Sequence, residues 1–206
     1  MAYYVTCSLK EVGESTDSRV ADFIQSGIRS SALKGQEVDI EASSEIETTY
    51  FSLETLRLLG RSTESPKLAR IILGLRNQDG SFGKGGYSRL ASVYYAVASL
   101  KLLGYDVKSL DNTLEWVRLC ENPQGGFGRS PRDFDAYLIL DELYYGVKAL
   151  EALGETAQHP QHNMQLIAKF QNPNGGFRRS IFLGTSTFEA TFYALSSLKS
   201  LLKSRT

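Results

Sequence analysis

Apolar residues recur at intervals of three and four along several segments of the chain, the spacing that places them on one face of an α-helix. In the segment 93–104, Tyr94, Val97 and Leu100 follow this spacing, and the segment ends at Gly104. Glycine commonly terminates a helix because it adopts the left-handed conformation without strain. The pattern therefore predicts a helix here with one buried face.

This predicted helix is one of five related copies. They begin near residues 2, 49, 93, 143 and 191, and four of them end in glycine. The first aromatic residues of successive copies are 47, 44, 50 and 48 positions apart: Tyr3, Tyr50, Tyr94, Tyr144 and Phe192. Near-constant spacing of this kind indicates an internal repeat.

A second helix is predicted after each glycine, over residues 17–29, 66–76, 111–120 and 160–170. Pro66 and Pro160 fit the first position of a helix, where proline loses no hydrogen bond. A glycine turn then leads to the next copy, as in the stretch Gln-Asn-Pro-Asn-Gly-Gly-Phe at 171–177. We expect the phenylalanine that follows each turn to pack onto the helices: Phe82, Phe127 and Phe177.

The glycine turn, followed by Tyr-Tyr-Ala-Leu-x-x-Leu-x-x-Leu-Gly, resembles the repeat of protein prenyltransferase β subunits and of squalene–hopene and related class II terpene cyclases. The resemblance implies an all-α fold, an (α/α) toroid of concentric helix pairs around an apolar cavity, as a single domain over residues 1–206. A closed ring in that superfamily takes about six pairs, whereas this chain has five predicted inner helices and four outer ones. We therefore expect an incomplete ring and association as a homo-oligomer or with a complementary subunit.

The resemblance also indicates where catalytic groups would lie. Zinc-dependent prenyltransferases use an Asp-x-Cys pair and a histidine at the starts of inner helices. Those positions hold Thr48, Ser92, Glu142 and Ala190, with Tyr50, Tyr94, Tyr144 and Phe192 at the cysteine position. Because zinc needs thiolate or imidazole donors, the sequence argues against zinc-dependent protein prenylation.

Class II cyclases instead protonate an alkene with an Asp-x-Asp-Asp run. The nearest match is Ile139-Leu140-Asp141-Glu142, which places Asp141 where the proton donor would be and lacks the first aspartate. Asp133 and Asp135 lie just upstream, so these four acids are candidates for a raised-pKa cluster or for a Mg²⁺ site with a diphosphate. The alternative is a solvated loop with ordinary acids at a helix N-terminus.

Basic and aromatic residues supply candidate binding groups. Arg129, Arg178 and Arg179 follow the glycine turns, as does Lys84, and the resemblance implies that an arginine here holds a diphosphate. Surface charge beside a turn is the alternative. The aromatic residues Tyr50, Tyr94, Tyr144 and Phe192 either line an isoprenoid cavity or pack the two helix layers together. Only one residue of each adjacent aromatic pair is expected to face inward, and the sequence does not say which.

Composition and charge narrow the possible functions of the protein. Lys plus Arg and Asp plus Glu both total 23, so net charge favours neither nucleic acid nor an anionic membrane. No apolar run is long enough for a membrane span, and no signal peptide begins the chain, which predicts a cytoplasmic protein. Two functions remain. One is an isoprenoid-binding protein of prenyltransferase or cyclase type, and the other is a non-catalytic binding or assembly module on the same scaffold.

Overall fold

The computed structural model describes residues 6, 18–33, 42–83, 88–133 and 138–203. In these ranges the chain forms eight α-helices and one short 3-10 helix, and the only β-type pairing is in isolated bridges. The predicted all-α fold is therefore confirmed. Among the described helices, none has both the length and the hydropathy that crossing a bilayer requires.

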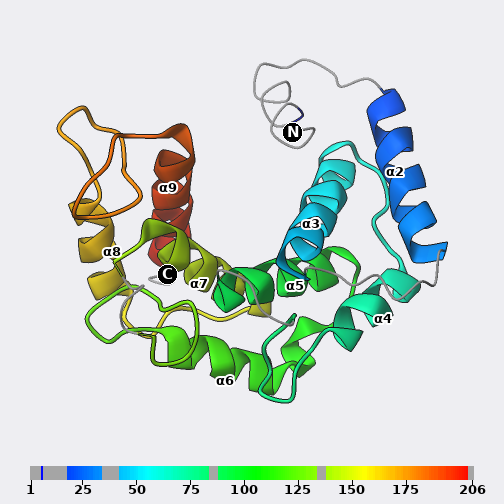
Figure 1. The fold of residues 1–206 in the computed structure, drawn as a ribbon, viewed down its shortest axis with the longest axis horizontal. Coiled ribbons are helices and arrows are strands. Elements are labelled where there is room, and N and C mark those ends of the chain that lie inside the picture. The colour runs from blue at the N-terminus through cyan, green and yellow to red at the C-terminus, as the bar shows by residue number, and fades with distance from the viewer. Residues whose placement is uncertain (1–5, 7–17, 34–41, 84–87, 134–137, 204–206) are drawn as a thin grey trace.

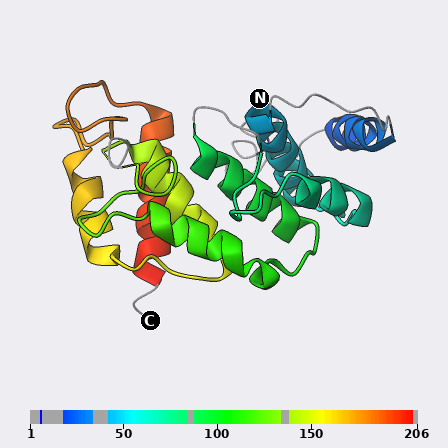
Figure 2. The same ribbon diagram turned by 60° about the horizontal axis from the view of Figure 1, so that its bottom comes forward.

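The helices form two layers. Inner helices pack on one another in chain order and form an arc (Figure 1): α3 (Ala42–Leu58), α5 (Arg89–Leu102), α7 (Leu140–Leu153) and α9 (Phe188–Lys203). Outer helices alternate with them along the chain: α2 (Ser18–Leu33), α4 (Pro66–Gly74), α6 (Asp111–Cys120) and α8 (Pro160–Lys169). A 3-10 turn, η1 (Val107–Ser109), precedes α6. Figure 2 shows from a second angle that α2 and α8 lie at opposite ends of the molecule.

The outer helices match the predicted ranges closely, but the inner helices begin three to seven residues before the starts predicted from their aromatic residues. The start of α5 shows why. Ser88 is its N-cap and accepts a hydrogen bond of 3.0 Å from the backbone N–H of Ala91, so the helix begins ahead of its first aromatic residue. The first predicted inner helix, near residue 2, lies outside the described residues apart from Thr6.

The glycine turns share one set of hydrogen bonds. In the third repeat, the N–H of Gly125 donates to the carbonyl of Asn122 at 2.8 Å, and the N–H of Asn122 donates to Gly126 at 2.9 Å. The turns at Asn77 and Asn172 repeat this pattern. The phenylalanines after the turns are all buried, as predicted: Phe82, Phe127 and Phe177.

Two of the three turns also pack closely against the first turn of the next outer helix. A Cβ placed on Gly80 would lie 2.4 Å from the carbonyl oxygen of Asn112 in α6, and one on Gly125 would lie 2.6 Å from that of His162 in α8. The same atom on Gly175 would meet nothing within 4 Å. Neighbouring repeats therefore meet through close backbone contacts. Among the described residues, no helix makes the corresponding contact with the turn at Gly175.

Candidate functional site

Two sets of candidate residues lie on the inner helices. The first set lies at the N-terminal ends of these helices, where backbone hydrogen bonds to the segments after the glycine turns bring arginines beside acidic residues. The segment after the turn at 171–177 runs beside the start of α7, because the N–H of Leu140 donates to the carbonyl oxygen of Arg179 at 2.9 Å. The start of α5 repeats this contact, with Leu90 donating to Arg129 at 2.9 Å. Each arginine therefore lies at the start of the preceding inner helix.

Asp141, the proposed proton donor, forms an ion pair with Arg179. The Nε of Arg179 lies 2.7 Å from Oδ2 of Asp141, and the arginine side chain is largely exposed whereas the aspartate is mostly buried. Burial raises the pKa of Asp141, and Arg179 opposes that rise. Burial is the larger of the two effects, so the pKa of Asp141 stays above its usual value despite the ion pair.

Glu142 is more deeply buried, with 1% of its side chain exposed. Ser88 donates a hydrogen bond of 2.7 Å to its Oε2, and Arg129 lies 3.6 Å from its Oε1, an ion-pair distance too long for a hydrogen bond. Burial raises the pKa of Glu142 to about 7, while Ser88 and Arg129 oppose the rise. A pKa of about 7 means that Glu142 titrates near neutral pH.

The predicted acidic cluster does not form a metal site in the part of the chain that the structure describes. No three histidine, cysteine, aspartate or glutamate side chains converge there as ligands for an ion. Asp141 and Glu142 instead pair with Arg179 and with Ser88 and Arg129. Asp135 and Lys84 lie outside the described residues. The acidic side chains that the structure describes here do not form the set of oxygen ligands that a resident Mg²⁺ ion requires.

Arg178 lies apart from this group. Its Nη2 donates to the backbone carbonyl of Lys169 at 3.3 Å, which directs it along the end of α8. Arg129 and Arg179 therefore share the N-terminal rim of the inner helices with the two acids, whereas Arg178 does not join them.

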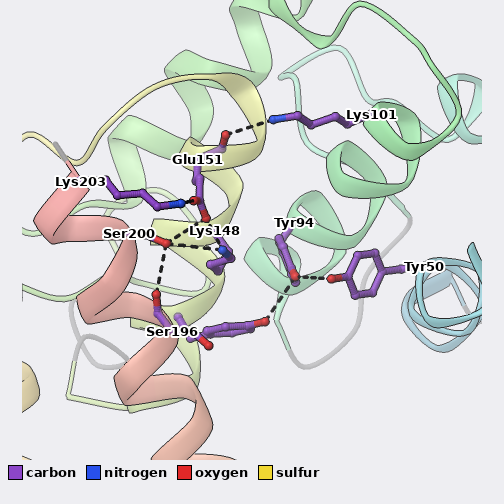
Figure 3. A network of polar contacts seen from close by, with 9 residues as sticks. Tyr50, Tyr94, Lys101, Lys148, Glu151, Ser196, Ser200 and Lys203 are labelled. Carbon is purple, nitrogen blue, oxygen red and sulfur yellow. Dashed lines mark hydrogen bonds and ion pairs between the residues drawn. The ribbon is translucent and has the colours of Figure 1, made fainter. Parts of the chain in front are cut away.

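The second set of candidates is a tyrosine cluster on the inner face. The hydroxyl of Tyr94 donates to that of Tyr50 at 2.9 Å and lies 3.3 Å from that of Tyr144, so one hydrogen-bonded row crosses α3, α5 and α7 (Figure 3). Burial raises the pKa of Tyr94 far above its usual value, so the hydroxyl stays neutral. Tyr144 in turn stacks on Tyr193 of α9, with ring centroids 4.2 Å apart.

Both members of the Tyr94–Tyr95 pair are buried against neighbouring helices. Tyr95 lies 5.4 Å from the ring of Tyr50 and donates a hydrogen bond of 3.1 Å to Glu47. Close inner helices flank α5 on both sides, so side chains about 100° apart can each reach a partner. In α9 the roles differ again, because Phe192 is 48% exposed and Tyr193 is the buried ring.

A cavity of about 290 Å³ opens beside Tyr50 and Tyr94 on the inner face. From the tyrosines it runs along α3, α5 and α7 toward their C-terminal ends. Its remaining lining residues are Glu54, Ala98, Lys101, Leu102, Lys148, Glu151 and Ala152. The aromatic rings thus form one end of a small apolar space, and lysines form the other.

Sequence reasoning missed the lysine end of this cavity. The signal was present in the position seven residues after each first aromatic residue. That position is basic in four copies and acidic in one: Lys10, Arg57, Lys101, Glu151 and Lys199. Among the basic residues at this repeat position, Lys101 contacts the single acid, Glu151.

The repeats, layers and turns define an α/α toroid domain. The chain belongs to the prenyltransferase alpha-alpha toroid domain family, whose family model matches residues 1–136 and 139–205. Among solved structures, it is similar to Candida albicans protein geranylgeranyltransferase-I complexed with GGPP, with 22% sequence identity and a TM-score of 0.64. That similarity covers 78% of this chain and 50% of the other, so the protein spans half the length of that relative. Comparison with curated protein sequences gave no match.

Proposed function

We propose that the protein binds an isoprenoid or a prenyl diphosphate against the tyrosine cluster of its inner helices. The observation that carries this proposal is the continuous row of Tyr50, Tyr94 and Tyr144 beside the 290 Å³ cavity. Aromatic faces favour contact with apolar chains and with developing positive charge. A GGPP complex of the similar solved structure supports the same ligand class.

Zinc-dependent transfer is no part of this proposal. Among the described inner-helix starts, the positions that would supply zinc ligands hold Thr48, Ser92, Glu142 and Ala190. Asp141 and Glu142 are the candidate acids for a catalytic step, and burial raises the pKa of both carboxyl groups, that of Glu142 to about 7. Magnesium would enter with the diphosphate of the ligand.

Thermal stabilisation by ligands tests the proposal. Farnesyl, geranylgeranyl and longer prenyl diphosphates at about 100 µM, with and without Mg²⁺, are expected to raise the melting temperature of the protein, because binding to the folded state adds to its stability. Tyr50→Ala should reduce the shift. Tyr105→Ala is the matched control, because Tyr105 is also half-buried but lies outside the cavity. No shift with any of these ligands would overturn isoprenoid binding.

An assembly role is a second candidate, favoured by an exposed apolar stripe on α9. Phe188, Phe192, Leu195 and Leu202 follow helical spacing and are 48–98% exposed. The opposite face of α9 packs on α7, and α7 also packs on α5. An inner helix within the arc therefore has another inner helix on each of two faces, whereas the exposed stripe leaves one face of α9 uncovered among the described residues. We propose that a second copy of the chain covers the stripe and the uncovered turn at Gly175.

A further inference from the structure

The C-terminal ends of α5, α7 and α9 carry a polar cluster centred on Glu151 (Figure 3). Ser200 donates a hydrogen bond of 2.8 Å to Oε2 of Glu151, and the Nζ of Lys203 lies 3.4 Å from Oε1. Lys148 forms an ion pair with the same carboxylate. Although burial opposes it, the hydrogen bond from Lys148 lowers the pKa of Glu151, so the carboxylate is ionised at neutral pH.

Positive charge exceeds negative charge in this cluster. Lys101 reaches the backbone carbonyl of Glu151, at 3.4 Å, rather than its carboxylate. The carboxylate of Glu151 thus pairs with Lys148 and Lys203, and Lys101 adds a further ammonium group beside it. The other acid in the cavity wall, Glu54, is already held by two hydrogen bonds of 2.6 and 2.8 Å from Arg57. An anion entering here would meet the ammonium group of Lys101, because the two nearby carboxylates, Glu151 and Glu54, are already paired with Lys148 and Arg57.

The cavity places this charge next to an apolar surface. Tyr50, Tyr94, Ala98, Leu102 and Ala152 line its body, and Lys101 and Lys148 are part of the same wall. A volume of about 290 Å³ lies at the lower end of the range for small-molecule sites. Such a space takes up about ten carbon atoms of a ligand with one charged end, and a longer isoprenoid chain would extend beyond it.

The opposite end of the inner helices offers less free charge. There Arg179 pairs with Asp141 and Arg129 with Glu142. Asp141 and Glu151 are ten residues apart on α7, so the two ends are separated by about 15 Å. Helix C-termini carry partial negative charge, which opposes an anion. Binding of an anion at the lysine end of the cavity therefore depends on the lysine side chains.

We propose that the anionic head of an amphiphilic ligand, a phosphate or a carboxylate, binds Lys101 and Lys148 while its apolar body lies against Tyr50 and Tyr94. The site rests on the proposed function for the isoprenoid nature of the apolar body. It assigns the charged head of that ligand to the lysine end of the cavity and leaves the arginines with their carboxylates.

Isothermal titration with four probes tests this assignment: geranyl phosphate, geraniol, decyl phosphate and inorganic phosphate. Geranyl phosphate should bind more tightly than geraniol, and inorganic phosphate alone should not bind measurably. Lys101→Gln and Lys148→Gln should each weaken geranyl phosphate by roughly tenfold, the size expected for a charge-assisted hydrogen bond. Lys169→Gln, on an exposed residue of α8 outside the cavity, should change nothing.

Glu151→Gln provides the sharper test because it acts in the opposite direction. Removing the competing carboxylate releases Lys148 from its ion pair, so the affinity for geranyl phosphate should rise by several-fold. If the lysines only stabilise the helix ends, none of these variants changes the affinity, and the assignment fails. Circular dichroism melts of each variant establish that the protein remains folded during the titration.

The outcomes separate this site from the proposed function. Equal binding of geraniol and geranyl phosphate, or a loss caused by Arg179→Ala and not by Lys101→Gln, would overturn the lysine site and leave isoprenoid binding standing. Decyl phosphate binding as tightly as geranyl phosphate with the same lysine dependence would support the site and overturn the isoprenoid preference. Absence of binding by every probe would overturn both.

Discussion

Ser88 joins two repeats through Glu142. The serine caps α5 by accepting the N–H of Ala91 at 3.0 Å, and its hydroxyl donates to the glutamate in the first turn of α7 at 2.7 Å. The two residues are 54 positions apart in the chain, and the glutamate is buried at their junction. A carboxyl group with a raised pKa thus lies between two inner helices, where its protonation affects how well the repeats hold together.

We predict that this carboxyl makes the protein less stable as the pH rises. The folded state raises the pKa of Glu142 from 4.5 to about 7, so between these values the folded protein holds a proton that the unfolded chain has lost. The stabilising contribution is complete below about pH 4.5 and is lost as the pH rises through 7. Glu142→Gln should remove this dependence and raise the free energy of unfolding at pH 8 by about 1–3 kcal/mol.

Urea unfolding at pH 5, 6, 7 and 8 measures the effect. Glu115→Gln is the control, since Glu115 is exposed on α6 and should leave the pH profile of the parent protein unchanged. Parallel profiles for the parent and Glu142→Gln would contradict the prediction.

The tyrosine row should stabilise the fold through its central hydroxyl. Tyr94→Phe keeps the ring but removes the group that lies 2.9 Å from the hydroxyl of Tyr50 and 3.3 Å from that of Tyr144. We expect a loss of about 1 kcal/mol, because buried hydroxyls lose a partner. Tyr105→Phe, outside the row, should change stability by less than about 0.5 kcal/mol. Equal effects of the two substitutions in thermal or urea unfolding would argue against the row.

Two glycines test the junctions between repeats. Gly125 and Gly175 occupy equivalent turns with φ of 100° and 84°, but only the first has a neighbouring backbone within reach of a Cβ. Gly175→Ala should cost about 1–2 kcal/mol for the left-handed conformation alone. Gly125→Ala should cost roughly 2–4 kcal/mol, since the added methyl group also meets the carbonyl of His162 at 2.6 Å.

Chemical unfolding of both alanine variants compares these costs directly. The difference between them reports the turn-to-helix contact, because the backbone strain is common to both. A larger loss from Gly175→Ala than from Gly125→Ala would contradict the packing at this junction.

Association should depend on the exposed stripe of α9. The double substitution Phe188→Asp and Phe192→Asp places charge where a second copy would pack, and it is expected to shift sedimentation at micromolar concentration to the monomer. Both side chains are exposed, 98% and 48%, so the fold should be retained. Leu119→Asp, on an exposed apolar residue of α6, is the control and should leave association unchanged. A parent protein that sediments as a monomer would refute the second-copy proposal.

Local pattern in the sequence was enough for the repeat and its parts. Helical spacing, the glycine after each segment and the Asn-Pro-x-Gly turns act over a few residues, so they predicted the outer helices at Pro66 and Pro160 and the buried Phe127. The sequence also shows that the positions compared with zinc ligands hold no cysteine or histidine, because a ligand set depends first on residue type and only then on geometry. Helix starts were less accurate, since the N-cap Ser88 lies ahead of the aromatic signal.

Tertiary structure alone decided which charges neutralise one another. Arg179 with Asp141, Arg129 with Glu142 and Lys203 with Glu151 are ion pairs that depend on how successive repeats pack. Repeat spacing could place each residue at a rim, but pKa values and net local charge depend on burial and on partners a few ångströms away. The sequence by itself determined the (α/α) scaffold, and the packing of the inner helices decided that Lys101, Lys148 and Lys203 lie beside Glu151 at their C-terminal ends.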